Sequence, residues 1–172
     1  DGTKAANPFA SKIIKRQPHF PTGIPDLIVA KSKFSRIAVV ELKRGPVDTK
    51  TVVQCMRYMY DLRYMLLGAI AKRHSEFLYQ SFDSLSHSIV HGILVGHSVP
   101  DQKIYACCEI AGLDIVTYKY QDGDYTFSYD YHDGYDDDHD TWAEGAIGDC
   151  FDECLDFWED HYRKVAAWSA VS

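Results

Sequence analysis

The stretch GIPDLIVAKSKFSRIAVVELKRG, residues 23–45, decides the fold. It contains two apolar runs rich in β-branched residues, at 24–30 and 36–43, and the polar turn KSKFS separates them. Such runs between turn signals predict two strands, and a Gly-Pro pair ends the second one. Because the turn is short, we expect the two strands to be antiparallel neighbours.

Besides Arg36, which begins the second strand, three charged residues lie in these strands, although buried sheets normally exclude charge. Asp26 is near the start of the first strand, and Glu41 and Lys43 are at the end of the second. Glu41 and Lys43 are two residues apart, so their side chains should project from the same face. In an antiparallel pair the start of one strand lies beside the end of the other. The sequence therefore predicts that all three side chains share a pocket.

Two carboxylates that are packed close together repel each other, and a divalent cation removes that penalty. Oxygen ligands from few protein positions suit Mg²⁺, or Mn²⁺ in its place. The amine of Lys43 could orient an attacking water, help lower its pKa or balance phosphate charge. These parts are typical of metal-assisted hydrolysis of a phosphodiester. The alternative is that the three residues are ordinary charges at a sheet edge.

The pattern Pro25-Asp26 followed by Glu41-Leu42-Lys43 resembles the PD-(D/E)xK nuclease superfamily, which has the restriction-endonuclease-like fold. The resemblance implies that Asp26, Glu41 and Lys43 are catalytic. It also implies that the Leu42 carbonyl completes a metal shell with the two carboxylates.

The segment VVELKRG, followed by an expected helix that carries Gln54, Arg57 and Tyr58, is similar to the RecB-like and NucS-like branches of that superfamily. The later segments GILVGHSV and GLDIVTYKY add to this similarity, which covers roughly residues 20–120. In those branches a glutamine at the position of Gln54 helps to place the substrate or the active site. The family often has a further acidic residue before the first strand, and this chain offers only Asp1 there.

The whole chain reads as α/β, with a mixed β-sheet flanked by helices. Residues 1–22 are expected to form an irregular or partly helical lead-in, residues 23–121 the nuclease core, and residues 122–172 an acidic loop and an amphipathic helix. The apolar periodicity predicts these further elements in order: a helix at 48–74, a strand at 89–96, a helix at 98–112, a strand at 113–120, an edge strand at 125–131 and a helix at 142–168.

The net charge of −7 over 172 residues is unevenly distributed. Residues 1–73 carry fourteen Lys and Arg against five Asp and Glu, a net +9, whereas residues 74–172 carry a net −16. A basic half indicates contact with a polyanion, and we expect nucleic acid, DNA rather than RNA. Arg44, Lys50 and Arg57 are the predicted phosphate contacts, because they lie close to the expected site in the sequence.

The acidic half includes YHDGYDDDHD at 131–140, which does not fit an EF-hand calcium loop because Tyr occupies two ligand positions. We interpret it as a solvated loop, with mimicry of nucleic acid as the alternative. The expected C-terminal helix has an apolar stripe that includes Phe151 and Trp158. This stripe could bury against a second copy of the chain or against a protein partner.

Other features exclude several classes of protein. No apolar run approaches the roughly 18–20 residues of a membrane span, and no signal-peptide pattern is present. The five cysteines lack a CxxC pair and indicate a reducing compartment, so we expect a cytoplasmic protein. The chain begins at Asp1 rather than Met, as expected of a fragment or a processed chain.

The sequence thus predicts a Mg²⁺- or Mn²⁺-dependent nuclease. Two alternatives stay open at this point. One is an inactive nuclease-fold module that binds nucleic acid within a larger complex, and the other is a toxin or defence effector nuclease.

Overall fold

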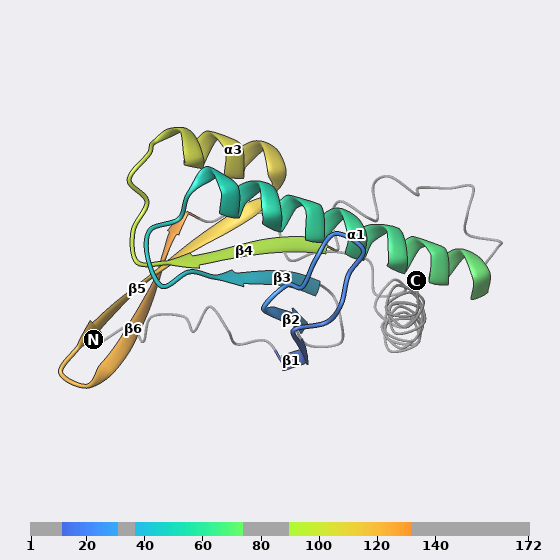
Figure 1. The fold of residues 1–172 in the computed structure, drawn as a ribbon, viewed down its shortest axis with the longest axis horizontal. Coiled ribbons are helices and arrows are strands. Elements are labelled where there is room, and N and C mark those ends of the chain that lie inside the picture. Colours follow the sequence, from blue (N-terminus) through green and yellow to red (C-terminus); the bar gives the residue numbers. More distant parts are fainter. Residues whose placement is uncertain (1–11, 31–36, 74–89, 132–172) are drawn as a thin grey trace, which may run out of the picture.

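The computed structural model describes residues 12–30, 37–73 and 90–131 (Figure 1). Within this part of the chain, six strands form one sheet in which each strand lies beside the next in sequence. The strands are β1 (Lys12–Arg16), β2 (Leu27–Ala30), β3 (Ile37–Leu42), β4 (Val90–Gly96), β5 (Leu113–Gln121) and β6 (Asp124–Tyr131). The helices are α1 (Thr49–Arg73), between β3 and β4, and α3 (Lys103–Ala111), between β4 and β5.

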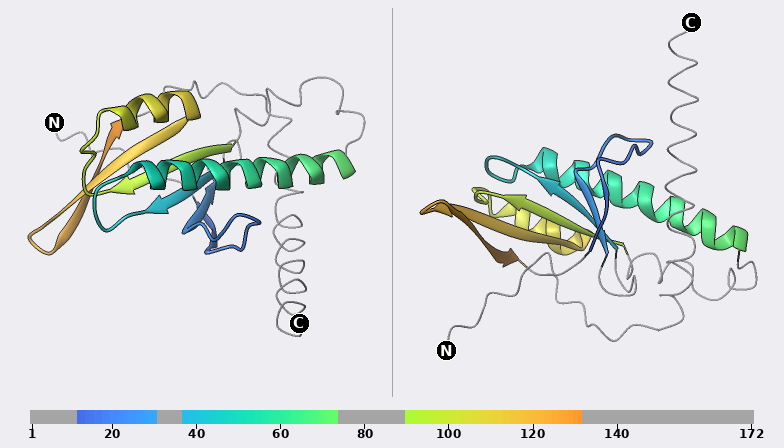
Figure 2. Two further views of the ribbon diagram at one scale, coloured as in Figure 1. Left: turned by 45° about the horizontal axis from the view of Figure 1, so that its top comes forward. Right: turned by 90° about the horizontal axis from the view of Figure 1, so that it is seen from below.

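The sheet is mixed. β1, β2 and β3 are antiparallel neighbours, β3, β4 and β5 are parallel, and β5 and β6 form an antiparallel hairpin. Consecutive parallel strands that are joined through helices in the same sense place both helices on one face of the sheet. Figures 1 and 2 show α1 and α3 together on one face. The mixed sheet with helices that was expected of a restriction-endonuclease-like α/β fold is confirmed.

The alternation of β3 determines which side chains face the helices. Ile37 and Val39 belong to the apolar core that α1 and α3 cover, whereas Ala38 and Val40 belong to a second apolar cluster on the opposite face. By the same alternation, the side chain of residue 41 points toward α1. The end of β3 therefore presents Glu41 to the beginning of that helix.

α1 lies very close to the sheet where it crosses β4. A Cβ atom on Gly92 would lie 2.1 Å from the Leu113 side chain and 2.6 Å from the sulfur of Met59. Only glycine leaves room for this approach. Cys55, from the same helix, lies beside it and is fully buried. This contact fixes the height of the first half of α1 above β3 and β4.

The structure corrects some expected boundaries. The lead-in was expected to lack strands, but Lys12–Arg16 forms β1, which pairs with β2 at the sheet edge. The second helix begins at Lys103 rather than soon after Pro100, and the Asp101 carboxylate accepts a hydrogen bond of 2.9 Å from the Lys103 amide. The expected C-terminal helix at 142–168 lies outside the described residues.

Of the helices in the described ranges, none is long and apolar enough to cross a membrane.

Candidate functional site

The two predicted carboxylates meet at the end of the β2–β3 pair. Leu27 lies opposite Val40 in the register of this pair, so Asp26 and Glu41 follow as the next opposed positions. The Asp26 carboxylate accepts a hydrogen bond of 2.8 Å from the backbone amide of Leu42. Asp26 is therefore fixed beside the end of β3, as the sequence predicted.

Glu41 is buried, with 4% of its surface exposed, and its Oε1 atom has no hydrogen-bond partner in the described part of the chain. The pKa of Glu41 is raised from 4.5 to about 7, mainly by burial and then by the charge of Asp26, although Lys43 acts in the opposite direction. A buried acceptor without a partner is costly, because it has lost its hydration without replacement. A positively charged ligand bound at this oxygen would remove that cost.

Lys43 follows β3 directly and is half-buried. Its backbone amide donates a hydrogen bond of 2.7 Å to the carbonyl of Val95 on β4, which holds the chain at this point. Its ammonium group lies near enough to Glu41 and Asp48 to lower the pKa of both carboxyl groups. The structure therefore brings together the three residues on which the prediction depends.

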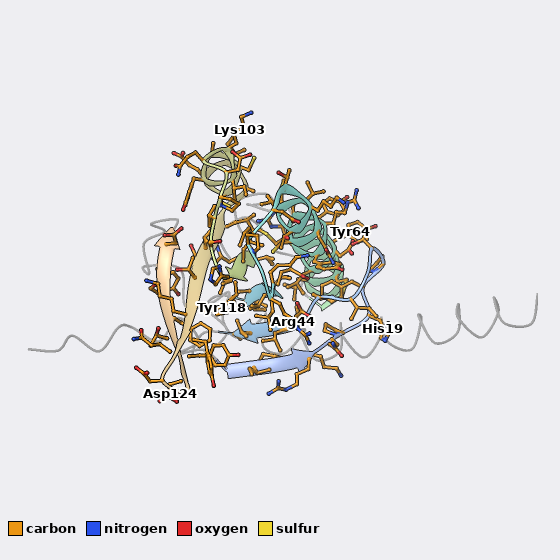
Figure 3. All side chains as sticks on the ribbon, turned by 60° about the vertical axis from the view of Figure 1, so that its left-hand side comes forward. His19, Arg44, Tyr64, Lys103, Tyr118 and Asp124 are labelled. Carbon is orange, nitrogen blue, oxygen red and sulfur yellow. The ribbon has the colours of Figure 1, made fainter. Side chains whose placement is uncertain are left out.

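Arg44, a predicted phosphate contact, is exposed at the next position. Its backbone carbonyl accepts a hydrogen bond of 2.7 Å from the hydroxyl of Tyr118, and Figure 3 shows the two residues side by side. This bond ties the turn after β3 to the β5–β6 hairpin. Arg44 is not among the residues that line the pocket described next.

The carboxylate of Asp48 caps the N-terminus of α1. The Asp48 carboxylate accepts hydrogen bonds of 2.7 Å from the Thr51 amide and 2.6 Å from the Thr51 hydroxyl. These bonds lower the pKa of Asp48 and satisfy an amide of the first turn. The cap fixes the direction in which the first turns of α1 present their side chains.

A pocket of about 430 Å³ lies between these first turns and the loop before β2. It contains the predicted Gln54, Lys50 and Arg57, which come from three turns of one helix face. Gln54 donates a hydrogen bond of 2.8 Å to the hydroxyl of Tyr58. The lining residues are Thr22, Thr49, Lys50, Val53, Gln54, Arg57 and Tyr58.

Two residues that shape this pocket were not identified from the sequence. Asp61, on α1, accepts hydrogen bonds of 3.0 Å from the amide and 2.5 Å from the hydroxyl of Thr22. Asp61 is buried, so these bonds satisfy its charge and hold the loop against the helix. The sequence does mark Asp61, because it is the one acidic residue in the apolar segment YMYDL, residues 58–62.

The carboxylate pair also fits a divalent cation. Within the described residues, no group of three or more His, Cys, Asp or Glu side chains could hold a metal ion. Mg²⁺, however, commonly uses one or two carboxylates and keeps several waters. The unsatisfied Oε1 of Glu41 beside Asp26 matches that pattern.

Three solved structures are similar to part of this chain. A repair endonuclease from Pyrococcus abyssi is 27% identical, with a TM-score of 0.43, and the match covers 61% of this chain and 37% of that one. EndoMS in complex with dsDNA is also 27% identical, with a TM-score of 0.43, over 61% of this chain and 35% of its own. SfsA from Pyrococcus furiosus in complex with Ca²⁺ is 14% identical, with a TM-score of 0.35, over 71% of this chain and 54% of that one.

The first two matches span little more than a third of the length of the proteins they concern. No protein-family model matches the chain, and no curated protein matches it.

Proposed function

We propose that this chain is a nuclease that uses a divalent cation, Mg²⁺ or Mn²⁺, to hydrolyse phosphodiester bonds of DNA. The observation that carries the proposal is the pair of half-buried Asp26 and buried Glu41, in which Oε1 of Glu41 has no hydrogen-bond partner among the described residues. A sheet would not retain two such carboxylates for stability, because their repulsion and desolvation both oppose folding. A site for a cation gives them a function.

Asp26, Glu41 and the carbonyl of Leu42 would hold the cation. When bound, it would polarise the phosphate and make a water molecule more acidic. The carboxylates supply the negative charge that selects a cation, and their spacing is fixed by the pairing of β2, which Asp26 precedes, with β3, which contains Glu41.

Lys43 does not bind the cation but acts on the attacking water or on the phosphate. Its ammonium group lies beside Glu41, where it can orient the attacking water or balance the charge that develops on the phosphate. The backbone hydrogen bond from Lys43 to Val95 keeps this residue at the end of β3. Gln54 supports the site from the first turns of α1, with its amide group held by Tyr58.

Contacts to the DNA backbone are assigned to Lys50 and Arg57 in the pocket and to the exposed Arg44. Cationic side chains of this kind position a strand through its phosphates without reading its sequence. Their contribution should weaken as salt concentration rises.

The test is incubation of the chain with labelled DNA and RNA, each single- and double-stranded, in the presence of Mg²⁺, Mn²⁺ or a chelator. The proposal predicts cleavage of DNA with either cation and no cleavage with the chelator. DNA binding without cleavage under every condition would overturn it and would instead favour a non-catalytic binding module.

A further inference from the structure

The exposed face of α1 carries a line of residues, and two of them have no role in the proposed cleavage reaction. Residues seven apart on a helix lie two turns apart on nearly the same line. Lys50, Arg57 and Tyr64 follow this spacing, with about 10 Å between successive members. Tyr60 lies one turn before Tyr64. We call the surface formed by these four residues the α1 track.

The first half of the track is the cationic side of the pocket. Lys50 and Arg57 both line the cavity of about 430 Å³, which is within the size range of small-molecule sites. The amide of Gln54 in the same cavity offers a group that can hydrogen-bond to a base. The cavity therefore combines cations with a polar group, as a site for a nucleotide requires.

The distribution of charged residues on α1 also favours the binding of a nucleotide. Asp61 is the only acidic residue between Thr49 and Arg73. It is 5% exposed, and Thr22 donates two hydrogen bonds to it, so its charge is directed away from solvent. The track thus presents cations without a competing exposed carboxylate on the same helix.

The second half of the track is a pair of tyrosines. Tyr60 and Tyr64 are 66% and 65% exposed, although large aromatic side chains are usually buried. Their rings are stacked, with centroids 6.4 Å apart and planes 17° apart. In Figure 3, Tyr64 appears on the same side of the molecule as the loop that bears His19, and Asp124 of the β5–β6 hairpin is on the other side.

Exposed aromatic faces next to cations are the two components of surfaces that bind single strands. Bases in a duplex are stacked on each other and their faces are not accessible, so an aromatic ring can stack only on an unpaired base. We propose that the α1 track binds a single-stranded stretch of DNA, with phosphates on Lys50 and Arg57 and unpaired bases on Tyr60 and Tyr64. This inference rests on the proposed function and names the form of its substrate.

The test measures binding without cleavage. Fluorescence anisotropy of a short labelled single strand, and of the blunt duplex of the same length, is recorded with the full chain in chelator. The chain should bind the single strand more tightly. Tyr60→Ala combined with Tyr64→Ala should weaken single-strand binding about 5-fold or more and change duplex binding by less than about 2-fold.

Two further variants separate stacking from other causes. Tyr60→Leu combined with Tyr64→Leu keeps apolar area but removes the ring faces, and it should lose single-strand binding like the alanine pair. Tyr120→Ala, at a tyrosine that is 63% exposed on β5, is the matched control and should bind as the unaltered chain does. Circular dichroism confirms that each variant is folded.

The inference is overturned if the alanine pair binds the single strand normally, if it loses duplex binding equally, or if Tyr120→Ala causes the same loss. Because the chelator removes free divalent cations, DNA binding in this assay does not depend on a cation held by Asp26 and Glu41. Strand-selective binding in a chain that never cleaves DNA would refute the proposed nuclease function and leave the α1 track supported.

Discussion

The carboxylate of Asp26 accepts a hydrogen bond of 2.8 Å from the backbone amide of Leu42. This bond joins the residue before β2 to the last residue of β3 and places Asp26 beside Glu41. The bond satisfies one oxygen of Asp26, whereas Oε1 of Glu41 has no partner within the described residues. A cation bound beside Oε1 would remove this imbalance.

A divalent cation should stabilise the folded chain. A ligand that binds only the folded state at about one hundred times its Kd adds roughly 2.7 kcal/mol. In a chain of this size that should raise the Tm by roughly 5–10 °C. Differential scanning fluorimetry with Mg²⁺ or Mn²⁺ measures this shift. Glu41→Gln and Asp26→Asn should abolish it, and an equal shift in either variant would contradict the assigned ligands.

Without a cation, the stability of the chain should fall as the pH rises. The pKa of Glu41 is about 7 in the folded chain, compared with its ordinary value of 4.5, so the folded state holds its proton more tightly than the unfolded state. Stability from this proton is fully present below pH 4.5 and is lost as the pH rises through about 7. The difference between the two pKa values corresponds to roughly 3 kcal/mol in the free energy of unfolding.

Urea unfolding of the unaltered chain and of Glu41→Gln, in chelator at pH 5 and pH 8, checks this pH dependence. Glutamine does not titrate, so the difference in unfolding free energy between the two proteins should change by roughly 2.5 kcal/mol over this range. The unaltered chain should be the one that loses stability toward pH 8. A difference that is independent of pH would show that Glu41 titrates normally in the folded chain.

Gly92→Ala should destabilise the fold, because its Cβ would lie 2.1 Å from Leu113 and 2.6 Å from Met59. Overpacking of this kind typically costs about 1–3 kcal/mol. The matched control is Gly45→Ala, since a Cβ there would have no atom within 4 Å. Chemical denaturation should give a change within about 0.5 kcal/mol for the control. Equal stability of the two variants would refute the close approach of α1 to β4.

Asp61→Ala should cost about 1.5–3 kcal/mol in the free energy of unfolding, because it removes the hydrogen bonds that Thr22 donates to a charged carboxylate. Thr22→Ala removes only the hydroxyl donor and keeps the backbone bond to Asp61, so its cost should be smaller. Urea unfolding of both variants gives the comparison. A larger loss in Thr22→Ala would mean that Asp61 does not anchor the loop beside the pocket.

The local features of the site could be predicted from the sequence, because short-range rules determine them. The alternation of side chains along β3 and the short turn before it were enough to place Asp26 beside Glu41. The helix-capping preference for short polar side chains left both Asp48 and Thr49 open, and the structure assigns the cap to Asp48.

The features of the fold that could not be predicted depend on contacts between segments that are distant in the sequence. Met56 lies at helical spacing from the buried Val52 and Met59, but it is 42% exposed, and the neighbouring Cys55 is buried instead. The helical period was correct, whereas the rotation of the helix is determined by how closely it packs on Gly92. β1 was missed because a short edge strand with three charged residues has no clear alternation.

The exposure of Tyr60 and Tyr64 could not be predicted for the same reason. Both lie in a helix whose apolar residues occur on several sides, and only the sheet beneath it determines which side is covered. The bond between Thr22 and Asp61 joins residues 39 positions apart, which no local pattern indicates.

The most direct test of the central claim is the rate of DNA cleavage in Mg²⁺ by the unaltered chain and by Asp26→Ala, Glu41→Ala and Lys43→Ala. Circular dichroism of each variant serves as the control for folding. The account predicts that each of the three substitutions abolishes cleavage while the chain stays folded. Undiminished cleavage in all three would contradict it.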